Sequence, residues 1–500
     1  MGGHLSHLKP EQHSEILETS AGPIKGNEYR HDSGKIVVDG YLGIPYANPV
    51  RKFQKAQMAD LWLEPRDCTK YGPICSQFGT FSEMEMVQKQ FEKFEVDDEK
   101  CLNLNVFAPR WKSEEFAKSG RPVMVFIHGG AFECGTSASF DDYSLSASLP
   151  LRDIILVTIN YRVGLFGFLT DGSKKYPGNL ALWDQTLALE WVQKHIASFG
   201  GNPGNVTIFG QSAGGGSVDL LSLSPKSRDL FHKWIPMSGA AMCHFSMRKF
   251  PVAMKNYQSL AESLGFPGGP EGLVEFFEAQ STSDIKKAIK DFKYSGDLIF
   301  GPTFDGDFFP QPLGALRKDA RKKPAIFGLC EYEGLLFATH AAHPDPEQGF
   351  REQLERFYNE DNCIEDPSAM REKVYAFYTR GITSGDKRRA AESARQLHRR
   401  SNLQHGNFRS GAERGAMRKR RLRLQFRISQ RGSGVRCAPT HFAVQKCRDA
   451  LHGLAIFAGG WDLHGVWGVE CGRSGGYGAD GQIFWEFCEI WIQLHEEVYQ

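Results

Sequence analysis

A serine flanked by small residues stands where a strand gives way to a helix. Positions 210–214 carry the sequence GQSAG, directly after the apolar run VTIF at 206–209. A short apolar run bounded by turn residues is typical of a buried strand. A serine at such a sharp turn leaves no room for large flanking side chains, and the bend lifts its hydroxyl clear of the sheet. The segment therefore predicts a nucleophilic Ser212 between a strand and a helix.

A second group of small residues lies upstream, at positions 128–132 (HGGAF), directly after the apolar run PVMVFI at 122–127. A hydrolase with a serine elbow needs backbone N–H groups to bind the oxyanion of its tetrahedral intermediate. One of them comes from the residue after the nucleophile. We therefore predict Gly130, Ala131 and Ala213 as the oxyanion donors. Either motif alone would indicate only a glycine-rich turn, whereas both motifs in this order indicate acyl transfer.

Further blocks make the chain similar to a known family. From Gly40 to about Phe337 the sequence resembles the type B carboxylesterase and cholinesterase-like family of α/β-hydrolases. The resemblance implies hydrolysis of small-molecule carboxylic esters by a serine, a glutamate and a histidine, in that chain order, without a cofactor. Besides the two motifs above, it rests on the blocks GYLGIPYANP, DEKCLNLNVFAP, DIILVTINYRVGLFGFL, PGNLALWDQTLALEWVQKHIASFGGNPGN and GPTFDGDFFP.

The order of apolar and helical segments agrees with that fold class. Apolar runs alternate with helical stretches, which indicates an α/β-hydrolase with a mostly parallel central sheet and helices on both faces. We expect residues 22–386 to form the catalytic domain, because no proline- or serine-rich linker interrupts them. Residues 1–21 precede that domain and residues 387–500 follow it. The apolar runs lie around Val123, Ile154, Val206, Trp234 and Ile326.

The acid partner is expected in a loop after a late strand. Residues 325–330 (AIFGLC) predict the strand, and the next four residues are Glu-Tyr-Glu-Gly. The x-Glu-Gly pattern resembles that of the family and selects Glu333, which would fix the tautomer of the catalytic imidazole and stabilise its charged form. Glu331 is interpreted as a solvated loop charge. Ser238, in PMSGAA, matches a family serine that supports this glutamate, although a plain turn serine is the alternative.

The third member of the triad departs from the family pattern. The family histidine should follow Glu333 far downstream, in a block resembling HxxELxY, and no such block occurs in the sequence. His441, His452 and His464 are the candidates in the given reading frame, and none has the expected flanking residues. His452 is nearest in spacing. A catalytically inactive, cholinesterase-like binding protein is therefore the alternative function.

The N-terminal residues and two cysteines bear on location. Residues 1–20 lack the apolar core of a secretory signal, and they fit the N-myristoylation pattern with Gly2 as acceptor. We therefore expect a cytoplasmic protein with at most weak membrane association, since one acyl chain binds membranes only marginally. Cys75 and Cys101 match a disulfide of secreted relatives. In a reducing cytosol we expect both to stay thiols.

Charge and the loop sequences limit the partners. The formal net charge of +1 provides no field for polyanions, so no nucleic-acid partner is expected. No spacing of cysteine and histidine indicates a metal site. The segment before Cys101 contains no tryptophan that could bind a choline cation, and Gln211 replaces the glutamate that many relatives carry before the serine. Short-chain or xenobiotic esters are the expected substrates.

The composition changes abruptly near Lys387. The following residues include RRAAESARQLHRRS and RKRRLRLQFRISQRGSGVR, and then a tail rich in glycine that carries cysteines. Three interpretations compete for residues 387–500. The basic run could contact nucleic acid or anionic lipid, or it could be a solvated disordered tail. It could also be the wrong reading frame of a normal C-terminal third.

The genetic code supports the third interpretation. Shifted forward by one nucleotide, the codons of RDALHGLAIF from Arg448 permit ATHCTDLPY, which resembles the histidine block of the family. In the same frame, RLRLQFRIS from Arg421 permits VYVYSFEY, which is similar to a core strand that precedes the block. The hypothesis is a one-nucleotide slip between residues 386 and 396. The missing histidine would then be encoded across the codons of Ala450 and Leu451.

Sequencing of the transcript through the codons of residues 380–400 tests this hypothesis. We expect one nucleotide more or fewer than the given sequence requires, with the family blocks restored downstream. An uninterrupted frame that encodes residues 387–500 as given would contradict it.

Overall fold

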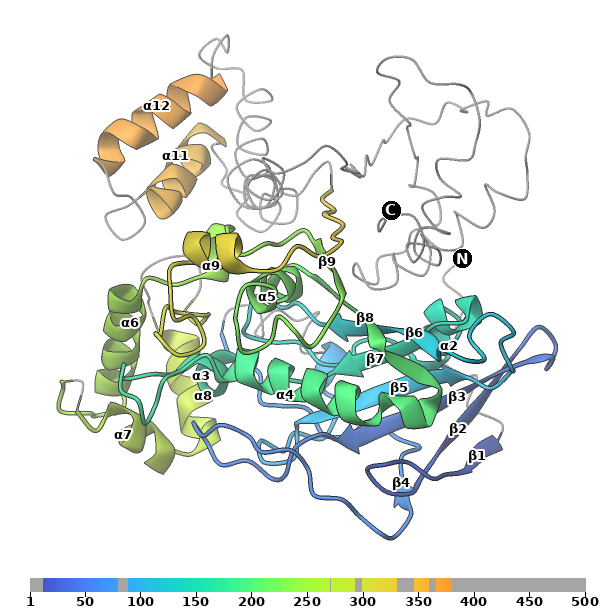
Figure 1. The fold of residues 1–500 in the computed structure, drawn as a ribbon. Coiled ribbons are helices and arrows are strands. Elements are labelled where there is room, and N and C mark those ends of the chain that lie inside the picture. The colour runs from blue at the N-terminus through green and yellow to red at the C-terminus, as the bar shows by residue number, and fades with distance from the viewer. Residues whose placement is uncertain are drawn as a thin grey trace, which may run out of the picture.

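The computed structural model of the protein describes residues 12–79, 89–269, 271–292, 299–330, 346–358 and 366–379 (Figure 1). Nine strands in these residues form one sheet in the order β1-β2-β3-β5-β7-β6-β8-β9, and β4 pairs with β2 outside that path. The strands are β1 (Gln12–Leu17), β2 (Ile24–His31), β3 (Ile36–Pro45), β4 (Arg66–Asp67), β5 (Asn103–Pro109), β6 (Arg121–Ile127), β7 (Ile155–Ile159), β8 (Gly201–Gln211) and β9 (Lys233–Met237).

The sheet is mixed, and its pairing changes direction at β7. The pairs β1/β2, β2/β3, β3/β5 and β5/β7 are antiparallel. The pairs β7/β6, β6/β8 and β8/β9 are parallel. The alternation of apolar runs predicted a mostly parallel sheet, and only the half that carries the serine fits that description. Antiparallel neighbours such as β2 and β3 need only a short turn, whereas each parallel pair needs a longer crossover.

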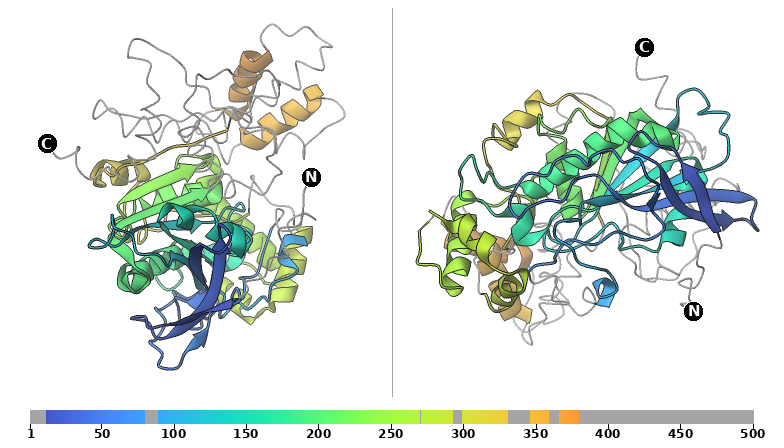
Figure 2. Two further views of the ribbon diagram at one scale, coloured as in Figure 1. Left: turned by 90° about the vertical axis from the view of Figure 1, so that its right-hand side faces the viewer. Right: turned by 90° about the horizontal axis from the view of Figure 1, so that it is seen from below.

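The N-terminal residues contribute to the sheet. Strand β1 lies inside the segment 1–21 and pairs with β2, so the sheet begins before residue 22. Figure 2 shows β1 and β2 at the end of the sheet that lies away from β9.

The strands of the parallel half are buried on both faces, as crossover topology requires. Along β6, Val123 and Val125 enter one apolar core, while Met124 and Phe126 enter another on the opposite face. The first core includes apolar side chains of α3, α4 and α5, and the second includes those of α2 and of the short helix η1. Helices therefore cover both faces of the strands that carry the site.

The helices near the site are α2 (Asp142–Ser146), η1 (Leu149–Arg152), α3 (Gly164–Phe168), α4 (Leu180–His195), α5 (Ala213–Leu221) and α9 (Leu313–Asp319). Helices α6 (Phe250–Ser263), α7 (Leu273–Ala279) and α8 (Thr282–Asp291) pack together beside the sheet (Figure 1). Helices α11 (Pro346–Phe357) and α12 (Pro367–Thr379) pack on each other through Phe350 and Tyr375. None of the helices in the described ranges is long and apolar enough to cross a membrane.

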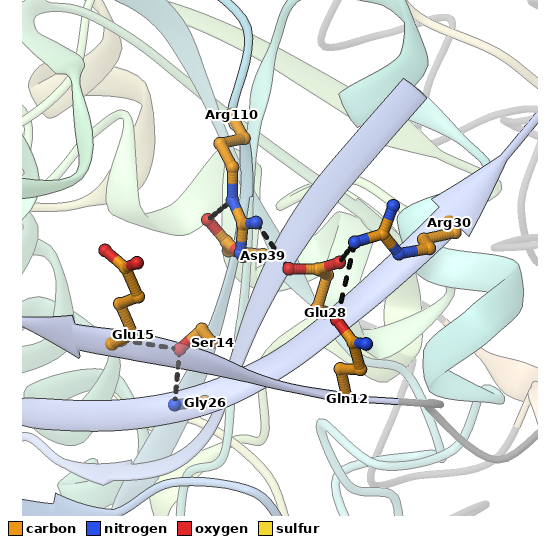
Figure 3. Close-up of polar contacts among 8 residues, drawn as sticks. All are labelled: Gln12, Ser14, Glu15, Gly26, Glu28, Arg30, Asp39 and Arg110. Carbon is orange, nitrogen blue, oxygen red and sulfur yellow. Dashed lines mark hydrogen bonds and ion pairs between the residues drawn. The ribbon is translucent and has the colours of Figure 1, made fainter. Parts of the chain in front are cut away.

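A polar network joins β2, β3 and β5 in the antiparallel half of the sheet (Figure 3). The Arg110 guanidinium, just after β5, donates two hydrogen bonds to the Asp39 carboxylate of β3 and one to Glu28 of β2. Arg30 forms a second ion pair with Glu28. Burial raises the pKa of Asp39, and the bonds from Arg110 oppose that shift. The network links neighbouring strands of the antiparallel half and lies away from Ser212.

A disulfide joins Cys75 to Cys101, with Cα atoms 4.9 Å apart. The expectation that both cysteines stay thiols is therefore wrong for this structure. The two side chains are brought together because Cys101 is held just before β5 while the segment around Cys75 packs against the core. The bridge anchors the segment around Cys75 beside the start of β5.

A buried ion pair fixes the chain after β7. The Asp184 carboxylate on α4 accepts hydrogen bonds from the Arg162 backbone N–H, Nε and Nη2, at 3.1, 2.7 and 2.6 Å. Both side chains are almost fully buried. A buried pair is stable only when its remaining hydrogen-bond positions are satisfied, and Arg162 Nη1 meets that need by donating to the Gln54 carbonyl.

Candidate active site

Ser212 occupies the predicted turn between β8 and α5. Its φ of 58° and ψ of −124° place a non-glycine residue in a strained conformation, which costs about 1–3 kcal/mol and persists only where the surroundings enforce it. The Ser212 N–H donates to the Met237 carbonyl at the end of β9, at 2.9 Å, and the Gly216 N–H donates to the Ser212 carbonyl, also at 2.9 Å. The serine is half-buried, whereas the α5 residues after it are buried.

The small residues around Ser212 are required by close backbone approach. A Cβ atom at Gly214 would lie 2.1 Å from the Ile127 carbonyl oxygen, and one at Gly210 would lie 2.6 Å from the same oxygen. A Cβ atom at Gly239 would lie 2.0 Å from the Ser212 carbonyl oxygen. The structure thus gives the flanking glycines the role that the sequence pattern predicted. No larger side chain fits without moving backbone.

The HGGAF loop follows β6 and lies next to Ser212. A Cβ atom at Gly129 would lie 3.2 Å from the Ser212 Cβ, so the loop backbone is in van der Waals range of the serine. Gly130, Ala131 and Phe132 all have positive φ, at 111°, 59° and 63°. The Gly130 carbonyl accepts hydrogen bonds from the Glu133 and Cys134 N–H groups, at 2.9 and 3.0 Å, which closes the turn.

The predicted oxyanion donors remain available for a ligand. Within the described ranges, the N–H groups of Gly130, Ala131 and Ala213 make no hydrogen bond to another residue. Ala131 and Ala213 are buried, and Gly130 is half-buried. Ala213 is also the first residue of α5, where the helix dipole favours negative charge. Unused donors of this kind beside a half-buried hydroxyl can stabilise a developing oxyanion.

Strained backbone is concentrated around this site. Nine non-glycine residues in the described part of the chain have positive φ, and four of them are Ala131, Phe132, Ser212 and Ser238. Such residues cluster where function requires a particular geometry. The distribution supports a functional interpretation of the elbow and its loop.

The histidines with described side chains form hydrogen bonds with residues other than Ser212. His128 is buried and stacks on Tyr161 at 4.1 Å, and its Nδ1 lies 2.9 Å from the Gly129 carbonyl oxygen. Burial lowers the pKa of His128 to about 4, so the ring is neutral at pH 7 and Nδ1–H is the donor. The other histidines with described side chains bond elsewhere, namely His13 to Asn27, His31 to Ser146, His195 to Ser20 and His232 to Val206. None of these rings hydrogen-bonds Ser212.

Ser238 contacts the segment that precedes the predicted acid loop in the sequence. It follows β9 with a φ of 51°, and its N–H donates to the Gly328 carbonyl at 2.8 Å. The predicted strand at 325–330 contributes two parallel bridges to β9, through Ala325 and Gly328, rather than a continuous strand. Ser238 therefore lies beside Gly328, which precedes Glu333 by a few residues in the sequence.

Other predicted residues lie outside the described ranges. They are Gly2, Glu333, His441, His452 and His464. Their roles stay predictions. Within the described ranges, no group of three or more acidic, cysteine or histidine side chains could hold a metal ion.

Sequence reasoning missed two groups that hold the HGGAF loop. The Tyr161 hydroxyl donates to the His128 carbonyl at 2.6 Å. The Gln77 side-chain oxygen accepts from the Gly135 N–H, also at 2.6 Å. Neither contact has a local sequence signal, because both residues are far from the loop along the chain.

A glycine substitution tests the packing of the elbow. Gly214→Ala places a Cβ against the Ile127 carbonyl, and overpacking of this kind typically lowers the free energy of unfolding by roughly 1–3 kcal/mol. The matched control is Gly314→Ala, at the same second position of α9, where a Cβ would meet open space. We expect the control to be neutral or stabilising by up to about 1 kcal/mol. Urea unfolding measures both variants, and equal stability of the two would contradict the packing described.

Comparisons with known proteins agree with the geometry. The model of the carboxylesterase family matches residues 13–451. The chain is 48% identical over 393 residues to esterase cest-33 of Caenorhabditis elegans, covering 77% of this chain and 69% of the relative. It is 34% identical over 384 residues to the para-nitrobenzyl esterase of Bacillus subtilis, covering 74% of this chain and 72% of the relative.

Other relatives are matched over a smaller part of their length. Carboxylesterase 5A of Canis lupus familiaris is 35% identical over 332 residues, and the match spans 65% of this chain and 56% of that protein. The chain thus spans little more than half of some relatives. The family match over most of the chain, together with the elbow and its loop, nevertheless decides its membership. The chain belongs to the carboxylesterase family, a family of serine hydrolases with the α/β-hydrolase fold.

Proposed function

We propose that this protein hydrolyses uncharged carboxylic esters through an acyl-enzyme on Ser212. One observation carries the proposal. The Ser212 hydroxyl stands at a strained turn beside the backbone N–H groups of Gly130, Ala131 and Ala213, which make no hydrogen bond within the described ranges. Membership of the carboxylesterase family supports the same reaction class.

The reaction begins with attack on the ester carbonyl. Ser212 Oγ bonds to the carbonyl carbon and gives its proton to a base, while the carbonyl π electrons move onto the oxygen. The N–H groups of Gly130, Ala131 and Ala213 bind the resulting oxyanion. The intermediate then collapses, the bond to the alkoxy group breaks, and the base returns the proton to the departing alcohol. Water, deprotonated by the same base, later releases the carboxylic acid and restores Ser212.

The base is proposed to come from the C-terminal third. The described histidines are engaged elsewhere, so the imidazole must come from another part of the protein. We propose the histidine encoded across the codons of Ala450 and Leu451 in the shifted frame, with Glu333 as its orienting carboxylate. His452 is the alternative in the given frame.

The preference for uncharged esters rests on Gln211. Its side chain is half-buried beside Ser212, and its Oε1 would lie 3.2 Å from a Cβ at Gly129. The amide therefore lies against the HGGAF loop and adds no charge there. A cationic substrate would find no carboxylate at this position.

Removal of the nucleophile tests the reaction. We expect Ser212→Ala to abolish hydrolysis of p-nitrophenyl butyrate and labelling by a fluorophosphonate, with losses of about a thousandfold or more, since the acyl-enzyme cannot form. The control is Ser217→Ala on the same helix, which removes a buried hydroxyl that accepts from Gln185. That variant should keep its activity. Both variants are made in the chain with the reading frame restored after Asp386, and equal activity of the Ser212 variant and its parent would contradict the proposal.

Substitution of Gln211 tests the substrate class. Gln211→Glu adds a carboxylate near the nucleophile, where one charge pair in water contributes about 1 kcal/mol. We expect kcat/KM for butyrylthiocholine to rise about fivefold relative to an uncharged thiobutyrate ester. Gln211→Met is the control, because it removes the amide without adding charge. The same ratio of the two substrates in both variants would show that position 211 does not set charge preference.

A further inference from the structure

The HGGAF loop and the residues that follow it to Gly135, together called the oxyanion loop, need contacts from other segments. Ala131 and Phe132 are non-glycine residues with positive φ, a strained conformation that persists only where the surroundings enforce it. The loop must therefore be fixed by groups that bind its carbonyl and N–H groups. Two segments, distant in the sequence, provide these contacts on either side of the loop.

On the first side, the chain after β7 holds the start and middle of the loop. The Tyr161 hydroxyl donates to the His128 carbonyl, and the Gly164 N–H donates to the Phe132 carbonyl at 2.7 Å. The buried pair of Arg162 and Asp184 fixes this segment. These contacts therefore tie the loop to the buried segment that follows β7.

On the second side, Gln77 holds the end of the loop by both atoms of its amide. Gln77 Oε1 accepts from the Gly135 N–H at 2.6 Å, and Nε2 donates to the Gly135 carbonyl at 3.3 Å. The Phe78 N–H adds a bond to the Glu133 carbonyl at 2.8 Å. Two side-chain bonds from Gln77 and one backbone bond from Phe78 thus hold the end of the loop.

Gln77 is itself fixed by the disulfide segment. Its Nε2 also donates to the Cys75 carbonyl at 2.6 Å, and Cys75 is bonded to Cys101. Gly135 also packs directly on the start of the loop. A Cβ atom added at Gly135 would lie 2.2 Å from His128 Nδ1. A shift at Gly135 therefore moves His128, Gly129 and the donors that follow them.

We propose that Gln77 is a positioning residue that sets the oxyanion hole by fixing Gly135 to the disulfide-anchored segment. The catalytic consequence rests on the esterase reaction proposed above. The N–H groups of Gly130 and Ala131 bind charge that develops only in the transition state. Their displacement should therefore lower kcat and leave KM unchanged.

Kinetics of two Gln77 variants test the catalytic part. Gln77→Met keeps the side-chain length and loses every hydrogen bond, and Gln77→Glu keeps only the acceptor for the Gly135 N–H. We expect kcat for p-nitrophenyl butyrate to fall by about tenfold to a hundredfold in Gln77→Met. In Gln77→Glu the second carboxylate oxygen replaces a donor and faces the carbonyls of Cys75 and Gly135, so kcat should fall at least as far as in Gln77→Met. KM should stay within about twofold in both.

A matched control separates positioning from general stability. Gln193 Nε2 also donates to two backbone carbonyls, those of Pro203 and Leu230, both at 2.9 Å, and these bonds lie away from the loop. Gln193→Met should destabilise the fold as much as Gln77→Met and leave kcat unchanged. A parallel loss of kcat, or an equal rise of KM, in the two variants would overturn the proposal.

Hydrogen exchange provides a readout that needs no turnover. We expect peptides spanning residues 128–136 to exchange about tenfold faster in Gln77→Met than in the wild type, with no such change in Gln193→Met. Unchanged exchange in this segment would overturn the proposal. The kinetics are measured in chains with the reading frame restored after Asp386. If the wild type in that frame shows no hydrolysis, the esterase proposal fails, and exchange alone then decides whether Gln77 holds the loop.

Discussion

The positive φ of Ser212 is the constraint on which the rest of the site depends. The turn is possible only because Gly210, Gly214 and Gly239 allow backbone atoms to approach within distances that any Cβ would block. The same close packing brings the ends of β6, β8 and β9 together, since Ile127 and Met237 supply the carbonyls against which the turn lies. The packing of these three strand ends therefore holds Ser212 in its strained conformation.

The oxyanion loop depends on the same packing, because it lies against Ser212 on the side of β6. Gly129 lies against Ser212, so the loop cannot move without opening a gap at the nucleophile. Its end is held by Gln77, and its start by Tyr161. The cost of positive φ at Ala131 and Phe132 is thus offset by contacts to two distant segments. A disulfide anchors one segment and a buried ion pair anchors the other.

The local features of the fold and of the site could be predicted from the sequence, and the contacts between distant segments could not. Strands β6 and β8, the turn at Ser212 and helix α5 follow from apolar runs and small residues within a few positions of each other. The antiparallel first half was missed, because an apolar run does not reveal the direction of its neighbour. The support from Gln77 was missed, since its partner Gly135 is brought near by the fold alone. The cysteines were expected to stay thiols because location was argued from residues 1–20, although the resemblance already paired Cys75 with Cys101.

The central claim is that an acyl group forms on Ser212. Rapid quenching of the protein with p-nitrophenyl butyrate, followed by mass spectrometry of the peptide that contains Ser212, tests it directly. The measurement is made on the chain as given and on a chain with the reading frame restored after Asp386. We expect a butyryl group on Ser212 in the restored chain and far less in the given one, because only the first provides the family histidine. Absence of the acyl group from Ser212 in both chains would contradict the account.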